Sequence, residues 1–269
     1  MKVRSLAAAA ALFSLAGITA EHADSAPASP VTGNVAVTSN YLFRSLTQTR
    51  GRPAIQGGAD YGNPNGFADG FWGSSINERS YPSGAMELDL YASYGQSINS
   101  DWSGRVGLYG YGYPGANLDQ AGLASHSLNT LEANAALTWK QFTLKYNHAL
   151  TDYFGVDTEQ GYAGDSKGTD YLQLDPAMPM NDVWSLALHA GHTHYTATLV
   201  DPFNGSRNPS YSDVGATLKA QLNGHGSFSG GVTYATNADF YRRTSGVLSA
   251  SDTRNVGGAR GFVMLQGTF

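Results

Sequence analysis

The chain has 269 residues, of which 14% are charged and 12% aromatic, with 33 glycines, no cysteine and a formal net charge of −5. The lack of cysteine excludes disulfides and cysteine-based metal or nucleophile sites, and the acidic balance leaves no basic footprint for nucleic acid. Charged residues make up about 25% of an average soluble domain, so this composition favours a membrane β-barrel, in which one face of each strand is apolar.

The N-terminus predicts an export signal. Lys2 and Arg4 precede an alanine-rich apolar stretch, and small residues follow up to Ala20. The apolar run is shorter than the roughly 20 residues that a membrane-spanning helix needs. We therefore predict a cleaved signal peptide over 1–20, a short flexible leader over 21–31, and an outer-membrane location for the rest of the chain.

Alternating apolar and polar residues then recur along the chain. Met86, Leu88 and Leu90, for example, alternate with Glu87 and Asp89. This period of two places successive side chains on opposite faces of a strand, whereas a helix would need apolar residues three and four apart. The segments with this pattern lie near 33–44, 52–61, 66–77, 85–96, 102–113, 129–140, 142–151, 169–176, 184–195, 211–222, 226–235 and 261–269.

The twelve segments predict an all-β fold, a transmembrane antiparallel up-and-down β-barrel over 32–269. Short turns alternate with longer loops rich in Gly, Ser, Asp and Asn, as in outer-membrane barrels, and the even strand count places both ends of the barrel on the periplasmic side. A secreted β-sandwich also has alternating strands and remains the alternative. The last strand ends on Phe269, which looks like the signature that barrel-insertion machinery recognises in outer-membrane proteins.

A family resemblance is densest over 32–77. The residues that carry it include Tyr41-Leu42-Phe43-Arg44, Pro53-Ala54-Ile55-Gln56-Gly57-Gly58, Asp60-Tyr61, Trp72 and Ser75-Ile76-Asn77. The stretch resembles the TorF-type porins, a proteobacterial outer-membrane family otherwise described as conserved hypothetical. The resemblance implies a barrel and suggests a porin role, and it brings no catalytic or solute-binding residue with it.

The inward faces of the predicted strands hold the groups that could act on a solute. Both signs of charge occur there, so we expect weak charge sorting rather than strong selectivity for anions or cations. The same charges could instead form salt bridges that fill and stabilise a narrow barrel. The residues that we place along the lumen are Arg44, Asp60, Glu87, Asp89, Arg105, Glu132, Lys145, Asp175 and Lys219.

Aromatic residues near the strand ends are expected on the apolar face, where they would form the girdles found at membrane surfaces. These are Tyr41, Phe43, Tyr94, Trp102, Trp139, Phe142, Trp184 and Phe269.

Histidines offer two other chemistries. His192 and His194 point to one side of a strand, a spacing that can ligate a metal, but no third ligand is evident. His126-Ser127 could suggest a lipid hydrolase, although neighbouring strand residues face opposite ways and no carboxylate evidently orients the histidine. We therefore predict no metal site, no cofactor and no catalytic residue.

The sequence favours a porin-like channel that lets small hydrophilic solutes diffuse passively, with the lipid bilayer and those solutes as its partners. Two alternatives remain: a closed barrel whose extracellular loops bind a surface partner, and a lipid-modifying barrel enzyme.

Overall fold

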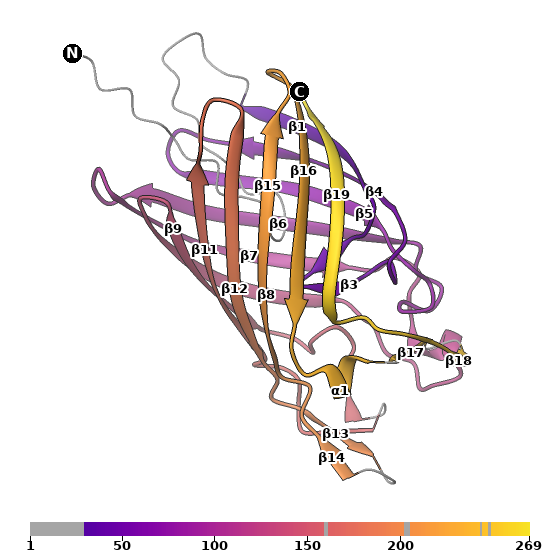
Figure 1. The fold of residues 1–269 in the computed structure, drawn as a ribbon. Helices are drawn as coiled ribbons and strands as arrows, with labels where there is room; N and C mark the ends of the chain where they lie inside the picture. Colours follow the sequence, from indigo (N-terminus) through magenta and orange to yellow (C-terminus); the bar gives the residue numbers. More distant parts are fainter. Residues whose placement is uncertain (1–29, 159–160, 202–204, 243, 247–248) are drawn as a thin grey trace, which may run out of the picture.

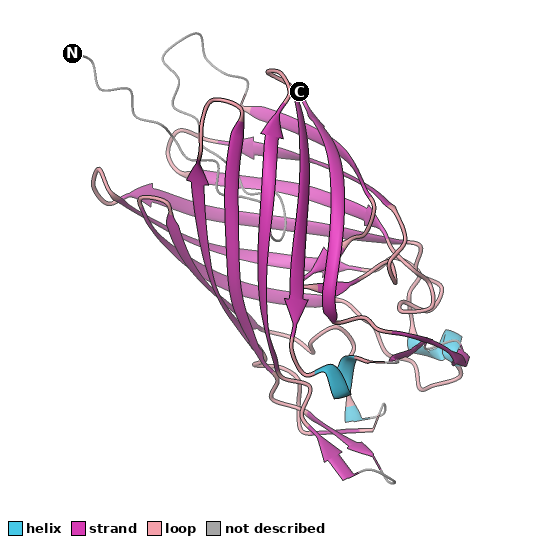
Figure 2. Ribbon diagram, viewed as in Figure 1, coloured by secondary structure: helices cyan, strands magenta, loops and turns pink. Residues whose placement is uncertain are grey.

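The protein forms a closed barrel of twelve antiparallel strands (Figures 1 and 2). The computed structural model describes residues 30–158, 161–201, 205–242, 244–246 and 249–269. The fold class and the strand count expected from the sequence are confirmed. The predicted signal peptide, 1–20, and nearly all of the leader lie outside the described residues. Among the residues described, no helix has the length and apolar character needed to cross a membrane.

Each barrel strand pairs with its neighbour in chain order, and β1 pairs with β19 to close the barrel, with Val37 opposite Leu265. The barrel strands are β1 (Val31–Thr38), β4 (Ala54–Gly62), β5 (Phe67–Ser75), β6 (Met86–Ser97), β7 (Trp102–Gly112), β8 (Thr130–Trp139), β9 (Phe142–Ala149), β11 (Asp170–Pro179), β12 (Trp184–His194), β15 (Tyr211–Gln221), β16 (Gly226–Ala235) and β19 (Gly258–Thr268).

The two ends of the barrel differ. One end, here called the short-turn end, carries the turns 63–66, 98–101, 140–141, 180–183 and 222–225. Both ends of the barrel sheet meet there, because Gly33 and Phe269 exchange backbone hydrogen bonds of 2.7 and 3.0 Å. The opposite, long-loop end carries the longer connections, which form small elements, among them α1, β13, β14, β17 and β18 at the bottom of Figure 1. The small elements of the longer connections are β2 (Leu42–Phe43), β3 (Leu46–Thr47), η1 (Leu118–Ala121), β10 (Tyr162–Ala163), β13 (Thr198–Asp201), β14 (Gly205–Arg207), α1 (Ala238–Tyr241), β17 (Thr244–Gly246) and β18 (Ser249–Arg254).

The strand faces separate apolar from polar side chains. Large apolar residues such as Ile55, Leu90 and Val232 point outward and are 63–66% exposed. Inward-facing positions hold tyrosines, threonines and charged residues, many of them buried. Contiguous exposed apolar surface is unfavourable in water but suits a barrel whose outer face contacts lipid.

The first strand is shorter than the sequence suggested. Alternation predicts a strand over 33–44, but β1 ends at Thr38 and the chain then turns into the barrel. Residues 39–53, here called the inner hairpin, bring β2 and β3 inside the long-loop end, and most side chains from Asn40 to Arg50 are buried. This hairpin is the element that shapes the candidate site.

Candidate functional site

The inner hairpin turns through two residues in an unusual conformation. Leu42 pairs with Thr47 and Phe43 with Leu46, so Arg44 and Ser45 form a two-residue turn. Both have positive φ, 48° and 62°. A two-residue hairpin of the common type I′ requires this, and it is normally built from Asn or Gly. Holding other residues there costs about 1–3 kcal/mol each, so contacts elsewhere must hold the turn in place.

Arg44 fastens the hairpin tip to one wall of the barrel. Its guanidinium donates to both carboxylate oxygens of Glu132 on β8, at 3.0 and 2.8 Å, and to the Tyr153 hydroxyl at 2.5 Å. It also lies 4.2 Å from the ring centre of Tyr171 on β11. Burial by itself would lower the pKa of Arg44, but Glu132, Tyr153 and Tyr111 together raise the pKa, so Arg44 stays charged.

Ser45 fastens the tip to another wall. Its hydroxyl donates to Asp213 on β15 at 2.9 Å. The Tyr171 hydroxyl donates to the same carboxylate at 3.1 Å, and His189 on β12 lies 2.8 Å from it. The other ring nitrogen of His189 lies 2.5 Å from Asp175. The hairpin therefore joins β8 to β15 across the interior through connected buried polar groups.

Tyr41 and Phe43 support the hairpin from inside, so their expected position on the outer face is wrong. Tyr41 packs edge-on against Trp72 of β5 at 5.4 Å, and Phe43 packs edge-on against Tyr111 of β7 at 5.6 Å. Both belong to a buried cluster at the long-loop end. The alternation of apolar and polar residues continues past Thr38, the last residue of β1, although the chain leaves the sheet there.

The six remaining aromatics of the expected girdle lie on the barrel strands or at their ends. Tyr94, Trp102, Trp139 and Trp184 are exposed on outward positions near the short-turn end. Phe142 stacks on Trp139 at 5.8 Å, and Phe269 is exposed at the end of the chain.

The nine residues expected along the lumen all lie inside the barrel, but their charges are unevenly placed. Glu87, Asp89 and Glu132 are buried near the long-loop ends of their strands. Three half-buried cations, Arg105, Lys145 and Lys219, lie toward the short-turn ends of their strands. Of the remaining carboxylates, Asp60 accepts a hydrogen bond from Tyr91 at 2.6 Å, and Asp175 is half-buried. Arg44 points inward from the hairpin tip rather than from a strand wall, which corrects the expectation that it lies on a strand.

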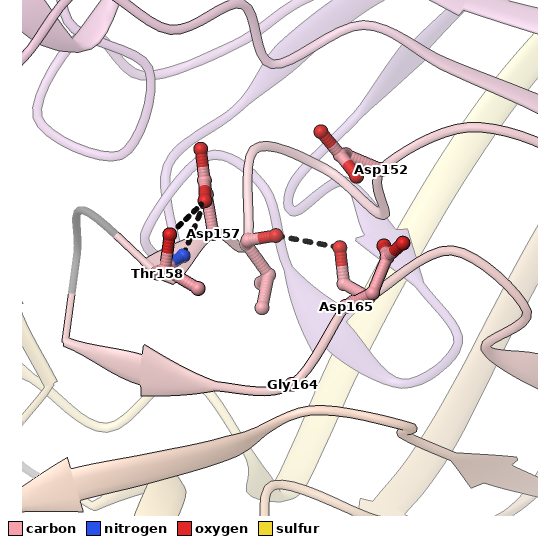
Figure 3. Close-up of a pocket in the computed structure, with 7 residues that line it drawn as sticks. Asp152, Asp157, Thr158, Gly164 and Asp165 are labelled. Atoms are coloured by element: carbon pink, nitrogen blue, oxygen red, sulfur yellow. Dashed lines mark hydrogen bonds between the residues drawn. The ribbon is translucent and has the colours of Figure 1, made fainter.

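Three side chains in the long loops could hold a divalent cation. His126 Nδ1 lies 3.0 Å from Asp157 and Nε2 lies 3.5 Å from Asp152, and their ligand atoms lie within 4.8 Å of one another. Asp152 and Asp157, with Asp165, line a cavity of about 330 Å³ (Figure 3). Burial raises the pKa of Asp152, His126 lowers it, and Asp165 raises it further. Exposed acidic side chains commonly gather in this way without a bound ion, so this arrangement alone does not indicate a metal site.

These contacts correct one expectation, because two carboxylates do lie beside His126. Within the described part of the chain, however, no hydroxyl side chain hydrogen bonds to its ring, and Ser127 accepts a bond from the Asn129 N–H instead. His192 and His194 are exposed on the outer face of β12.

A protein-family model matches residues 22–269, and it describes a bacterial protein family of unknown function, Gcw_chp. The chain belongs to this family. No curated protein matches the sequence. Among solved structures, this Gcw_chp protein is similar to the KdgM porin in complex with disordered oligogalacturonate, with a TM-score of 0.52 and 9% identity over 89% of this chain and 98% of that chain.

Two further solved structures are similar to this Gcw_chp protein over the same shares of both chains. One is the KdgM porin, with a TM-score of 0.51 and 9% identity. The other is the NanC porin, with a TM-score of 0.49 and 10% identity. At these identities the likeness to KdgM shows a shared fold alone, a porin-type barrel.

Sequence reasoning missed Ser45 and Tyr153, which lie outside the barrel strands. It also missed Tyr171, His189 and Asp213, which lie on strands beside outward apolar residues, so strand parity already places these three inside the barrel. Their convergence depends on the register in which β11, β12 and β15 pair, which the sequence does not display.

Proposed function

We propose that the protein is an outer-membrane channel through which small hydrophilic solutes diffuse passively, and that the inner hairpin sets the width of its lumen. The observation that carries the proposal is a polar, charged interior enclosed by a barrel with an apolar outer face. Barrels of eight strands are filled by their own side chains and those of about sixteen leave an aqueous channel, so twelve strands leave room that a hairpin can narrow.

The lumen charges would sort solutes weakly. Acidic groups gather near the long-loop end, and Arg105, Lys145 and Lys219 lie nearer the short-turn end. A solute that crosses the barrel meets both signs in turn, which favours modest discrimination by size and charge. The resemblance to TorF-type porins supports the same role.

The proposed location requires export and insertion. Residues 1–20 would be removed as a signal peptide, and the last strand, ending on Phe269, would be recognised by the barrel-insertion machinery. The aromatic residues near the short-turn end would anchor the barrel at the periplasmic surface of the bilayer. The long loops would then face the outside of the cell.

Single-channel recording tests the proposal. The mature protein is refolded in detergent, its heat-modifiable migration is checked, and it is inserted into a planar lipid bilayer. Discrete current steps are expected. If the folded wild type never conducts, and the Arg44→Met variant, which lacks the buried ion pair to Glu132, never conducts either, the channel is contradicted.

The hairpin itself favours a second candidate, a closed barrel whose loops bind a surface partner, because it fills the long-loop end with buried side chains. On that hypothesis, removing the long connection between β16 and β19 abolishes binding of the surface partner. Neutralising the charges in the lumen leaves that binding unchanged.

A further inference from the structure

Two neighbouring carboxylates inside the barrel are buried without sufficient partners. Glu87 and Asp89 lie two apart on β6, so both point inward, and they are 1% and 0% exposed. The Tyr113 hydroxyl donates to one oxygen of Glu87 at 3.1 Å. The other oxygen of Glu87 and both oxygens of Asp89 have no hydrogen bond of normal geometry within the described residues. The Tyr41 hydroxyl, which also has no such bond, lies near Glu87, and the Gly112 N–H lies near Asp89. Burying ionised carboxylates in this way is unfavourable, so the pair must either take up protons or bind a cation.

Aromatic rings surround the pair. In the register of the sheet, Asp89 lies between Trp72 of β5 and Tyr111 of β7. Tyr81 and Tyr113 stack at 4.5 Å in the same buried cluster. The faces of such rings carry partial negative charge and attract cations, and they do so most strongly where water is excluded. The surroundings of the two carboxylates therefore favour a positively charged group.

The same lumen shows how it holds a cation. The guanidinium of Arg44 is bound by one carboxylate, Glu132, by a tyrosine hydroxyl and by the ring face of Tyr171. Glu87 and Asp89 repeat this composition with two carboxylates in place of one. Unlike Glu132, neither forms a salt bridge within the described parts of the chain.

We propose that Glu87 and Asp89 form a binding site for an organic cation that carries a guanidinium or ammonium group. This inference rests on the proposed channel, because it makes cationic molecules the solute class that the lumen recognises. The carboxylates supply the charge, the Tyr113 hydroxyl orients Glu87, and the rings of Trp72 and Tyr111 flank the bound group.

Methylguanidinium, which reproduces the head group of Arg44, is the probe, and methylurea is its uncharged isostere. Calorimetric titration of the folded protein in detergent is expected to show saturable binding of methylguanidinium and none of methylurea. The Glu87→Gln/Asp89→Asn variant should bind methylguanidinium at least tenfold more weakly. Asp60→Asn is the matched control, because it neutralises a buried lumen carboxylate on β4 that has a tyrosine partner, and it should bind as the wild type does.

Bilayer recordings separate this inference from the channel itself. If the wild type conducts but binds no methylguanidinium, or if binding survives the double variant, the site is wrong and the channel stands. If the wild type binds the probe and never conducts, the site stands and the channel is wrong.

Two further measurements complete the test. If the double variant fails to fold, Glu87→Gln and Asp89→Asn are titrated singly, and each must weaken binding of methylguanidinium. Binding of Ca²⁺ alone, lost in the same variants, would make this a metal site and overturn the organic-cation proposal.

Discussion

The Arg44–Glu132 ion pair predicts how firmly the inner hairpin is held. Arg44→Met keeps most of the length of the side chain but removes the guanidinium. The paired side chains are only 3% and 1% exposed. Removing one partner of such a buried pair costs about 3–5 kcal/mol, because the other charge stays buried alone. The penalty falls on the docked hairpin only, since release would let water reach Glu132.

A penalty of about 4 kcal/mol shifts the ratio of docked to released hairpin by roughly a thousandfold, at 1.4 kcal/mol per factor of ten. Arg44→Met is therefore expected to raise the unit conductance in single-channel recordings. A second readout uses the lack of native cysteine. Ser45→Cys places a thiol at the tip, where the serine is 2% exposed, and a hydrophilic thiol reagent should label it far faster when Arg44→Met is also present.

Glu132→Gln provides the control. The Arg44→Met/Glu132→Gln double variant no longer buries an unpaired charge, so its tip should be labelled more slowly than that of Arg44→Met alone. Purely additive effects of the two substitutions, or an unchanged conductance and labelling rate in Arg44→Met, would refute the conclusion that this pair holds the hairpin.

Two predictions concern the barrel wall, and both are measured as the temperature at which the barrel loses its folded migration on a gel. Gly191→Ala should lower that temperature, because the new Cβ would lie 2.6 Å from Cζ of Tyr171, and overpacking of this kind costs about 1–3 kcal/mol. Gly110→Ala is the control, since its nearest atom is 3.7 Å away, and equal effects of the two would contradict the reasoning. Leu90→Arg, on the outer face in the middle of β6, should cost about 2–4 kcal/mol in a bilayer, and Val31→Arg at the short-turn end about 0–1 kcal/mol. A cost that does not differ between these two positions would show that the outer face does not contact lipid.

Much of the barrel could be predicted from the sequence, because the period of two is a local property of each strand. Glu87 and Asp89 must face away from Leu88 and Leu90 whatever the neighbouring strands are. The alternation of short turns with long loops predicted the up-and-down order of the strands. The inward orientation of residues such as Asp60 and Glu132 followed from their odd or even position along the strand.

The tertiary structure decided what happens inside the barrel. Tyr41 and Phe43 continue the alternation of β1, but alternation cannot report that a chain has left its sheet and turned inward. The hairpin is held by contacts to residues distant in sequence: Arg44 reaches Glu132, 88 residues away, and Ser45 reaches Asp213, 168 residues away. Only barrel closure brings those walls together, so the strained turn and its partners exist only in the folded molecule.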